Sequence, residues 1–300
     1  LMIGEGMIYK NKKLNSIFSY IKTSSLILSY LKIVSSSFKD IRVVKNELQS
    51  FFGFSCINRI LLYYSKRIVL KCSYEICMEE IAKSFKRSII TGNKEDRFAM
   101  VEVKIAKKLG LSLTCIPHGL EYSYRFPSAV AGDIFYCTSL ESSLMLRDIY
   151  NDKKFVFDEK INTMIYGGRR DRIKNDSHEL VFFTEPRNIH VNQKIINSLQ
   201  DNNISFKVKL HPADDCQNYP QSDLKFVNDL SEALNSKIFI ARKSTVLLDA
   251  VYRGSEAISL LIDSKDDYYA NYVFPSLSNP KIRKCYKIKD LVNVLKLYYV

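Results

Sequence analysis

Short apolar runs alternate with longer amphipathic segments along most of the chain, and this alternation predicts an α/β fold. Continuous apolar runs of this length are typical of strands that are buried on both faces of a parallel sheet. The segments between them repeat apolar residues at helical spacing, so we expect helices that connect successive strands. The predicted strands are Ser88–Thr91, Leu111–Ile116, Asp133–Cys137, Leu180–Thr184, Phe206–Leu210, Lys237–Ala241 and Ala257–Leu261.

Two of the predicted helices end at glycines. The segment from Arg97 to Leu109 has strong helical periodicity and is followed by Gly110, a residue suited to the left-handed conformation that closes many helices. A second helix follows Ser244 and ends at Gly254. We expect most of residues 1–60 to be helical as well. An opening strand at Leu1–Ile3 and helices at Cys72–Phe85, Ser139–Ile149, Val191–Gln200 and Ile288–Tyr299 complete the prediction.

These elements form two sets, separated by a polar stretch at Tyr150–Asn162 that has no clear period and is typical of a linker or a crossover. A length of 300 residues agrees with two domains at roughly 150 residues each. We therefore predict an α/β protein with two tandem Rossmann-like, doubly wound domains, at residues 1–155 and 156–300.

The net charge of +13 is concentrated near the N-terminus, since residues 1–75 contain 12 Lys and Arg against 4 Asp and Glu. A basic surface fits three environments: water alone, an anionic membrane, or nucleic acid. Leu14, Ile17, Phe18 and Ile21 follow i, i+3, i+4, i+7 spacing. This spacing predicts a helix with one apolar face that either packs on a core or lies at a bilayer interface. Zinc-finger spacing and an RNP-like motif are absent from the sequence, so nucleic-acid binding is not expected.

Several motifs that identify other functions are absent from the sequence. Seven cysteines are scattered without a C-x-x-C pair, which is typical of reduced thiols in a cytoplasmic protein. There is no P-loop, G-x-S-x-G, H-E-x-x-H or Asp-x-Asp motif and no Cys/His cluster, so we expect neither a metal site nor a cofactor. No apolar run reaches the roughly 20 residues of a membrane-spanning helix.

Candidate functional residues follow the predicted strands of the second half, because ligands bind beyond the carboxyl ends of strands in an open parallel sheet. His211-Pro212 follows one strand. Pro212 lacks an N–H and ends the strand pairing, and the His211 imidazole can protonate or hydrogen-bond a phosphate. The alternative is that His211 only terminates a strand. Glu185 follows another strand and is a further candidate for contacts with a donor substrate.

A second group of candidates opens the helix that ends at Gly254. Ser244 is a good N-cap residue, and the first-turn N–H groups of a helix bind anions. Arg242 and Lys243 precede Ser244 and Thr245 directly, so two cations accompany this anion site. The alternative is a capped helix with solvated charges. Taken with His211 in the preceding loop, these residues indicate a phosphate at this edge of the sheet.

The first half has two weaker candidates. Pro117-His118-Gly119 follows a predicted strand, and Gly119 would let the backbone approach a ligand closely. Glu5 lies between two glycines after the opening strand, where it is expected to be an exposed acid. The spacing around Glu5 lacks the third glycine of a dinucleotide-binding fingerprint.

These motifs resemble those of the GT-B glycosyltransferases of bacterial surface polysaccharides, in particular the CMP-sugar-dependent sialyltransferases and capsule polysialyltransferases. Those families have an acidic-Gly loop in the N-terminal domain and His-Pro and Ser/Thr motifs in the C-terminal domain. The matching residues here are Glu5-Gly6, His211-Pro212 and Ser244-Thr245. The segment from Thr91 to Arg97, with Pro117-His118-Gly119 and Gly132-Asp133, also resembles capsule and teichoic-acid glycerophosphotransferases.

The resemblance implies an inverting, metal-independent glycosyltransferase that moves a sialic-acid-like sugar from a CMP donor to an O-antigen (lipopolysaccharide) or capsule chain. By this likeness Glu5 is the general base that deprotonates the acceptor. His211 protonates or hydrogen-bonds the departing phosphate, which Ser244 and Thr245 hold. The implied partners are a nucleotide sugar and a lipid-linked or polysaccharide acceptor. The implied location is cytoplasmic, with peripheral contact at the inner face of the bacterial cytoplasmic membrane.

Two departures from the family pattern bear on these expectations. Gly4 stands where many relatives have a second acid, and the strands that normally precede this loop are missing before Leu1. The N-terminal domain is therefore expected to be incomplete. Two alternatives stay open: a CDP-glycerol-type polyol-phosphate transferase, and a non-catalytic polysaccharide-assembly protein that has kept the fold.

Overall fold

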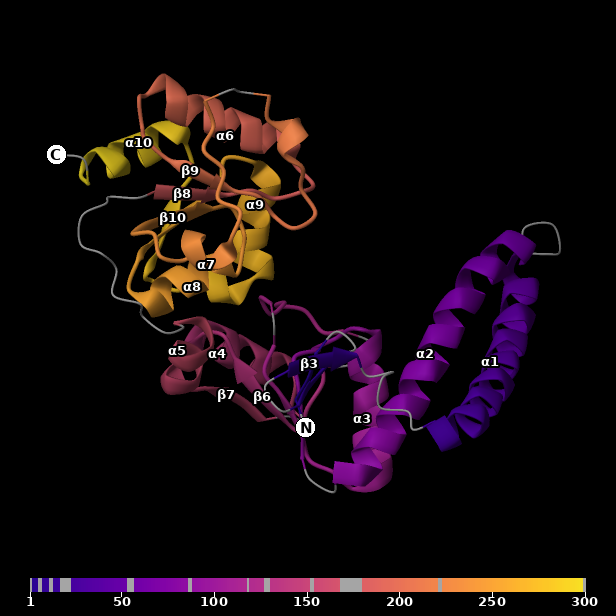
Figure 1. Ribbon diagram of the computed structural model, residues 1–300. Helices are drawn as coiled ribbons and strands as arrows, with labels where there is room; N and C mark the ends of the chain where they lie inside the picture. The colour runs from indigo at the N-terminus through magenta and orange to yellow at the C-terminus, as the bar shows by residue number, and fades with distance from the viewer. Residues whose placement is uncertain are drawn as a thin grey trace. The chain divides into compact units, whose positions relative to one another are not determined.

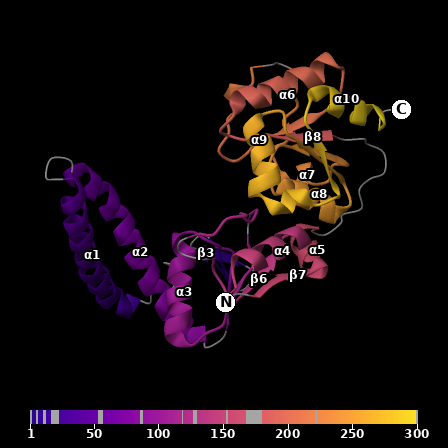
Figure 2. The ribbon, with the colours of Figure 1, turned by 180° about the vertical axis from the view of Figure 1, so that it is seen from behind.

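The computed structural model describes residues 2–4, 7–10, 13–16, 23–52, 57–85, 88–117, 119–126, 130–151, 154–167, 180–220 and 223–298. The chain folds into two compact units that interleave along the sequence, and Figures 1 and 2 show them from opposite sides. Unit 1 comprises Leu1–His118, Arg125–Tyr136 and Asp152–Val156. Unit 2 comprises Gly119–Tyr124, Cys137–Asn151 and Phe157–Val300.

Within the described residues, the sheet of unit 1 has seven strands in the order β3-β2-β1-β4-β5-β6-β7. Strands β1, β4, β5 and β6 pair in parallel, whereas β2 pairs antiparallel with β1 and β3. A parallel sheet is therefore extended by an antiparallel edge. The strands are β1 (Met2–Gly4), β2 (Met7–Lys10), β3 (Lys13–Ser16), β4 (Ile89–Thr91), β5 (Leu113–Cys115), β6 (Ile134–Cys137) and β7 (Lys154–Phe157).

The antiparallel edge corrects the prediction for the N-terminal region. The amphipathic helix expected from Leu14, Ile17, Phe18 and Ile21 is wrong at its start, because Leu14 lies on strand β3. The other three positions lie outside the described residues. Cross-strand pairing of β2 with β3, down to the pair Lys10 and Lys13, overrides the helical spacing.

Three helices belong to unit 1: α1 (Thr23–Phe52), α2 (Ile57–Phe85) and α3 (Arg97–Leu109). Helix α1 packs against α2, and α2 packs against α3 (Figure 1). The helix predicted from Cys72 begins much earlier, because the whole of α2 is continuous.

The prediction for α3 is confirmed at both ends. The Asp96 carboxylate accepts hydrogen bonds from the N–H groups of Phe98 and Ala99, which caps the first turn. Gly110 closes the helix at φ 63°, a left-handed conformation that glycine adopts without strain.

Unit 2 contains a five-stranded sheet whose described pairings are all parallel, in the order β12-β11-β10-β8-β9. The chain starts at β8, adds β9 on one side, and then adds β10, β11 and β12 on the other. This is a doubly wound Rossmann-like order whose switch point lies between β8 and β10. The strands are β8 (Leu180–Phe183), β9 (Lys207–Lys209), β10 (Ile238–Ala241), β11 (Glu256–Leu260) and β12 (Ile282–Cys285).

Helices cover both faces of this sheet, as its continuous apolar strands predict. Phe239 and Ala241 of β10 pack in one hydrophobic cluster with Leu247 of helix α8, whereas Ile240 packs with Ile195 of helix α6 in a second cluster. The α-helices of unit 2 are α4 (Leu140–Ile149), α5 (Glu159–Tyr166), α6 (Ile189–Asp201), α7 (Leu230–Ala233), α8 (Val246–Arg253), α9 (Ser264–Tyr268) and α10 (Ile288–Lys296).

The stretch Tyr150–Asn162, predicted to be a linker or a crossover, passes from unit 2 to unit 1 and back, but it contains regular structure. Strand β7 and the first part of helix α5 occupy this stretch. Helix α5 begins where the Asp158 carboxylate accepts a hydrogen bond from the N–H of Ile161 at 3.0 Å. A short strand is followed directly by a short helix here. Each is too short for its pattern of apolar and polar residues to be recognised in the sequence. The α/β class with two Rossmann-like sheets is confirmed.

Candidate functional site

Glu185 and Lys243 meet at the switch point of the unit 2 sheet. Glu185 follows β8 and Lys243 follows β10, and these strands are direct neighbours. The Lys243 backbone N–H donates to Glu185 Oε1 at 3.0 Å, and the Lys243 ammonium donates to Oε2 at 2.7 Å. The side chains keep 14% and 16% of their surface exposed, so solvent reaches the pair. A carboxylate and a cation therefore stand where sheets of this kind bind ligands.

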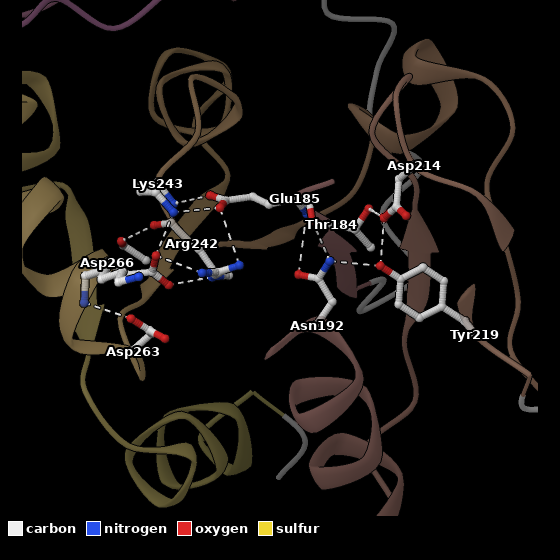
Figure 3. Close-up of polar contacts among 11 residues, drawn as sticks. Thr184, Glu185, Asn192, Asp214, Tyr219, Arg242, Lys243, Asp263 and Asp266 are labelled. Atoms are coloured by element: carbon white, nitrogen blue, oxygen red, sulfur yellow. Dashed lines mark hydrogen bonds and ion pairs between the residues drawn. The ribbon is translucent and has the colours of Figure 1, made fainter. Parts of the chain in front are cut away.

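Arg242 lies beside this pair, and its side chain has no exposed surface. Its Nε and Nη2 donate to the two carboxylate oxygens of Asp266 at 2.5 and 2.8 Å, a bidentate ion pair (Figure 3). Asp266 Oδ1 also accepts from the Lys243 ammonium at 2.6 Å, and Arg242 Nη1 lies 3.4 Å from Glu185 Oε2. The two cations are thus matched by two carboxylates in one network. The predicted role of Arg242 in ligand binding stays untested.

Asp214 fixes the loop that carries His211. Its Oδ2 accepts from the hydroxyls of Thr184 at 2.6 Å and Tyr219 at 2.7 Å, and its Oδ1 accepts from the Asn218 amide at 3.1 Å. The Thr184 hydroxyl in turn accepts the backbone N–H of His211 at 3.1 Å. Burial raises the pKa of Asp214, but these hydrogen bonds outweigh burial and hold its pKa below the usual range.

Asn192 of helix α6 connects the two groups of polar residues. Its side-chain N–H₂ donates to the Glu185 carbonyl and to the Tyr219 hydroxyl, both at 2.8 Å (Figure 3). Asn192 is fully buried, and burial also raises the pKa of Tyr219. The ends of β8 and β10 are therefore joined to the His211 loop by a continuous chain of hydrogen bonds.

His211 itself is exposed, as is Pro212 after it. Its Nδ1 accepts the backbone N–H of Ala213 at 3.1 Å. A neutral imidazole in this arrangement carries its proton on Nε2, the nitrogen that is left to donate to a ligand.

Ser244 and Thr245 open helix α8. Thr245, not Ser244, occupies the N-cap position, and its side chain makes no capping hydrogen bond. The Ser244 hydroxyl accepts from the N–H of Val246 at 3.4 Å. Both residues are partly exposed at a helix N-terminus, where the helix dipole favours an anion. The N–H groups of Leu247 and Leu248 in the first turn already donate to the Ser244 and Thr245 carbonyls.

The sheet order corrects the arrangement expected for these loops. The His211 and Ser244 loops follow consecutive strands in the chain, but β8 lies between β9 and β10. The Glu185 loop therefore separates them. Since neighbouring strands lie about 4.8 Å apart, the His211 and Ser244 loops start roughly 10 Å from each other.

Four residues of this network were missed by the sequence analysis: Asp266, Asp214, Asn192 and Tyr219. Asp263 and Asp266 have the spacing of a helix-capping pair, and Asp263 does cap α9 through the Lys265 N–H at 2.7 Å. The spacing gives no sign that Asp266 turns to Arg242. Asp214 lies three residues after His211. A short polar residue at this place after a strand often stabilises a turn, and this was the one signal in the sequence that could have identified it.

Unit 1 carries a different polar cluster at the end of β4. Glu102 of α3 is fully buried, and its Oε1 accepts from the Tyr74 hydroxyl at 2.5 Å and the Asn93 amide at 2.7 Å. Burial raises the pKa of Glu102 to about 7, although hydrogen bonds from Thr91, Tyr74 and Asn93 oppose the rise. The sequence analysis singled out the segment from Thr91 to Arg97, which contains Thr91 and Asn93, but did not identify Tyr74 or Glu102.

Two of the first-half candidates cannot be placed, because Glu5 and His118 lie outside the described residues. Gly119 is described, and a Cβ atom added there would meet no heavy atom within 4 Å. Glu121 nearby is buried, and its carboxylate accepts from the Thr138 N–H at 2.5 Å and from the Ser276 hydroxyl at 2.7 Å. The roles predicted for Glu5, His118 and Gly119 stay predictions.

The part of the chain that the structure describes contains neither a candidate metal site nor a candidate membrane-spanning helix. Among these residues, no group of three or more His, Cys, Asp and Glu side chains could hold a metal ion. No helix within the described ranges is both long and apolar enough to cross a membrane.

Comparisons with known proteins find similarity in structure but not in sequence. No protein-family model matches the chain, and no curated protein matches it. The UDP-GlcNAc 2-epimerase of Methanocaldococcus jannaschii matches with a TM-score of 0.51 and 10% identity, over 76% of this chain and 74% of that one. Its complex with UDP-GlcNAc and UDP matches with a TM-score of 0.50 and 11% identity, over the same shares. Acinetobacter baumannii MurG covers 79% of this chain and 71% of its own at 10% identity, with a TM-score of 0.43.

At these identities the likeness concerns the fold. The chain has the α/β architecture of the GT-B type, with two Rossmann-like units, as the sequence motifs predicted. The candidate site lies at the switch point of one of those units.

Proposed function

We propose that this protein is a glycosyltransferase-type enzyme that binds a nucleotide sugar at the carboxyl edge of the unit 2 sheet, with CMP as the nucleotide. The observation that carries the proposal is the convergence of Glu185, Lys243, Ser244 and the His211 loop on neighbouring strand ends. The likeness in fold to an epimerase solved with UDP-GlcNAc and UDP supports a nucleotide sugar as the ligand class. The His-Pro and Ser/Thr motifs support CMP.

In this proposal the phosphate of the donor binds at the N-terminus of helix α8. The Ser244 hydroxyl donates to its oxygens, and the dipole of helix α8 favours its negative charge. Lys243 is the cation that reaches it, because its ammonium is partly exposed. The ammonium is shared between Glu185 and Asp266, so it can turn toward a phosphate while one carboxylate stays bonded.

Arg242 acts as a positioning residue in this scheme. Its side chain is buried and paired with Asp266, so it holds the carboxylates that orient Lys243 and does not contact the ligand. His211 is the residue that stabilises the departing phosphate, through donation from Nε2. Because charge builds up on that phosphate as the glycosidic bond breaks, a donor at this position lowers the barrier. Glu5 stays our candidate for the base that activates the acceptor.

Thermal unfolding with and without nucleotide tests the proposal. CMP at a concentration of about 100 Kd is expected to stabilise unit 2 by about 2.7 kcal/mol, a shift of several degrees in Tm. Ser244→Ala and His211→Ala should reduce or abolish the shift. Ser198→Ala and His190→Ala, both on helix α6, are the matched controls and should keep it.

The same assay separates the alternatives. A shift with UDP or UDP-GlcNAc and none with CMP would overturn the CMP assignment while leaving nucleotide-sugar binding intact. A shift with CDP-glycerol that exceeds the shift with CMP-sialic acid would favour a polyol-phosphate transferase. No shift with any nucleotide would overturn the function itself and favour the non-catalytic assembly protein.

A further inference from the structure

The helical hairpin of α1 and α2 has an end that packs on the rest of unit 1 and an end that does not. Figures 1 and 2 both place the C-terminal end of α1 and the N-terminal end of α2 away from α3. We call this end, residues 45–52 and 57–69, the distal end. The C-terminal half of α2 packs against α3, where Tyr74, Cys77, Met78 and Ile81 are buried.

Few side chains at the distal end are fully buried. Among the described side chains of α1, which are those of residues 31–51, only Ser37 is buried, and it is polar. Among the described side chains of α2, the first buried one is Ile68. The apolar side chains between the two helices are partly but not fully buried here, so this contact is less stabilising than the packing of α2 on α3, because tertiary packing of an apolar face supplies most helical stability.

Large apolar side chains are instead turned outward there. Phe51 is 83% exposed and Leu62 is 65% exposed, and they lie on either side of the connection between the helices. Tyr63 and Tyr64 are also exposed, at 55% and 42%. Four large exposed apolar side chains at one end of a hairpin are unusual on a free surface and indicate an interaction site.

Basic side chains surround these apolar residues. Lys66 lies one turn from Leu62, and Arg67 stacks over the Tyr63 ring at 4.4 Å. Among the described side chains of the distal end, three basic residues are exposed against one acidic residue: Lys45, Lys66 and Arg67 against Glu47. Four further exposed cations lie elsewhere on the hairpin, and one of them, Lys71, pairs with Asp40: Lys32, Lys39, Arg42 and Lys71.

We propose that the distal end of the α1–α2 hairpin docks on an anionic lipid bilayer. Lysine and arginine are attracted to the charged headgroups, and tyrosine favours the boundary between headgroups and acyl chains. Phe51 and Leu62 enter the apolar layer beneath. A nucleic acid would satisfy the cations and its bases could stack on Phe51, but it offers no apolar layer for Leu62. A second copy of the hairpin would bring like charges together. An anionic bilayer matches both the cations and the apolar side chains.

Vesicle co-sedimentation tests this inference independently of the nucleotide assay. The wild-type chain is expected to bind vesicles of phosphatidylcholine with 30% phosphatidylglycerol, and to bind pure phosphatidylcholine at least tenfold more weakly. Phe51→Ser with Leu62→Ser, and separately Lys66→Glu with Arg67→Glu, should each reduce binding about tenfold or more. Raising the salt concentration should weaken the binding of the wild type.

Matched changes in unit 2 are the controls. Leu297→Ser removes another highly exposed leucine, and Lys281→Glu with Lys289→Glu reverses two exposed charges. These variants should bind vesicles like the wild type, and circular dichroism should show that all variants are folded. Equal binding to neutral and anionic vesicles, no binding to either, or unchanged binding of the distal-end variants would overturn the proposal. So would concentration-dependent dimerisation that Phe51→Ser and Leu62→Ser abolish.

Discussion

The carboxyl edges of the two sheets hold buried carboxyl groups in opposite ways. In unit 2, Asp266 forms a bidentate ion pair with Arg242, so its negative charge meets a positive one inside the protein. In unit 1, Glu102 receives neutral donors from Tyr74 and Asn93, and its pKa rises to about 7. One edge therefore carries a fixed, ionised network, and the other a carboxyl group that exchanges its proton near neutrality.

Removing the charge of Asp266 at the carboxyl edge of the unit 2 sheet is expected to have the largest effect on the free energy of unfolding. Asp266→Asn leaves the Arg242 guanidinium buried without its carboxylate, and breaking a buried pair in this way costs about 3–5 kcal/mol of unfolding free energy. Urea unfolding measures the loss. Asp267→Asn, on the same helix, exchanges a carboxylate that bonds only an exposed amide of Asn271, and should cost under about 1 kcal/mol. Equal losses in the two variants would show that the ion pair does not stabilise this edge.

Glu102, at the carboxyl edge of the unit 1 sheet, is expected to make the free energy of unfolding depend on pH. Glu102 binds its proton more tightly in the folded state, at a pKa of about 7, than in the unfolded chain, at about 4.3. Its stabilising effect is therefore complete below about pH 4.3 and is lost as pH rises through 7, by up to about 3 kcal/mol. Glu102→Gln should remove that part of the pH dependence.

Urea unfolding at pH 5 and pH 8 measures this difference. Glu232→Gln, at an exposed position, is the control and should follow the wild type. If Glu102→Gln loses as much stability as the wild type between the two pH values, Glu102 is not the group that titrates.

A smaller effect is expected from Tyr74→Phe, which removes one donor from Glu102 and leaves the packing of the ring. A hydrogen bond to a carboxyl group is worth about 2 kcal/mol. Because the Tyr74 hydroxyl lowers the pKa of Glu102, its loss should also move the pH midpoint upward. Tyr64→Phe, on an exposed ring, should change neither quantity by more than about 0.5 kcal/mol or a few tenths of a pH unit. An unchanged midpoint in Tyr74→Phe would contradict the assigned contact.

The sequence predicted the parts of the fold whose signals are local. Helix α3 was found from Arg97 to Leu109 because a glycine closes it, and β8 and β10 were found because they are continuously apolar. The antiparallel strands β2 and β3 were missed, since their partner strands and not their own residues define them.

The candidate site was predicted in part for the same reason. His211, Glu185 and Ser244 follow strands, and a strand end can be read from one segment of chain. The contact of Asp266 with Arg242 joins residues 24 positions apart through a side-chain rotamer, which no local pattern specifies. The order of the strands was equally hidden, so the sequence could not show that Glu185 lies between the other two loops.

The lack of fully buried apolar side chains among the described residues of helix α1 also has a consequence for local unfolding. Amide protons exchange with solvent when a segment opens, and the free energy of opening follows the apolar surface that the segment buries. Strands β8 and β10 lie wholly inside their unit, whereas no apolar side chain among the described ones of α1 is fully buried. In the free protein, the amides of α1 should therefore exchange long before those of β10, and proteases should cut the hairpin first.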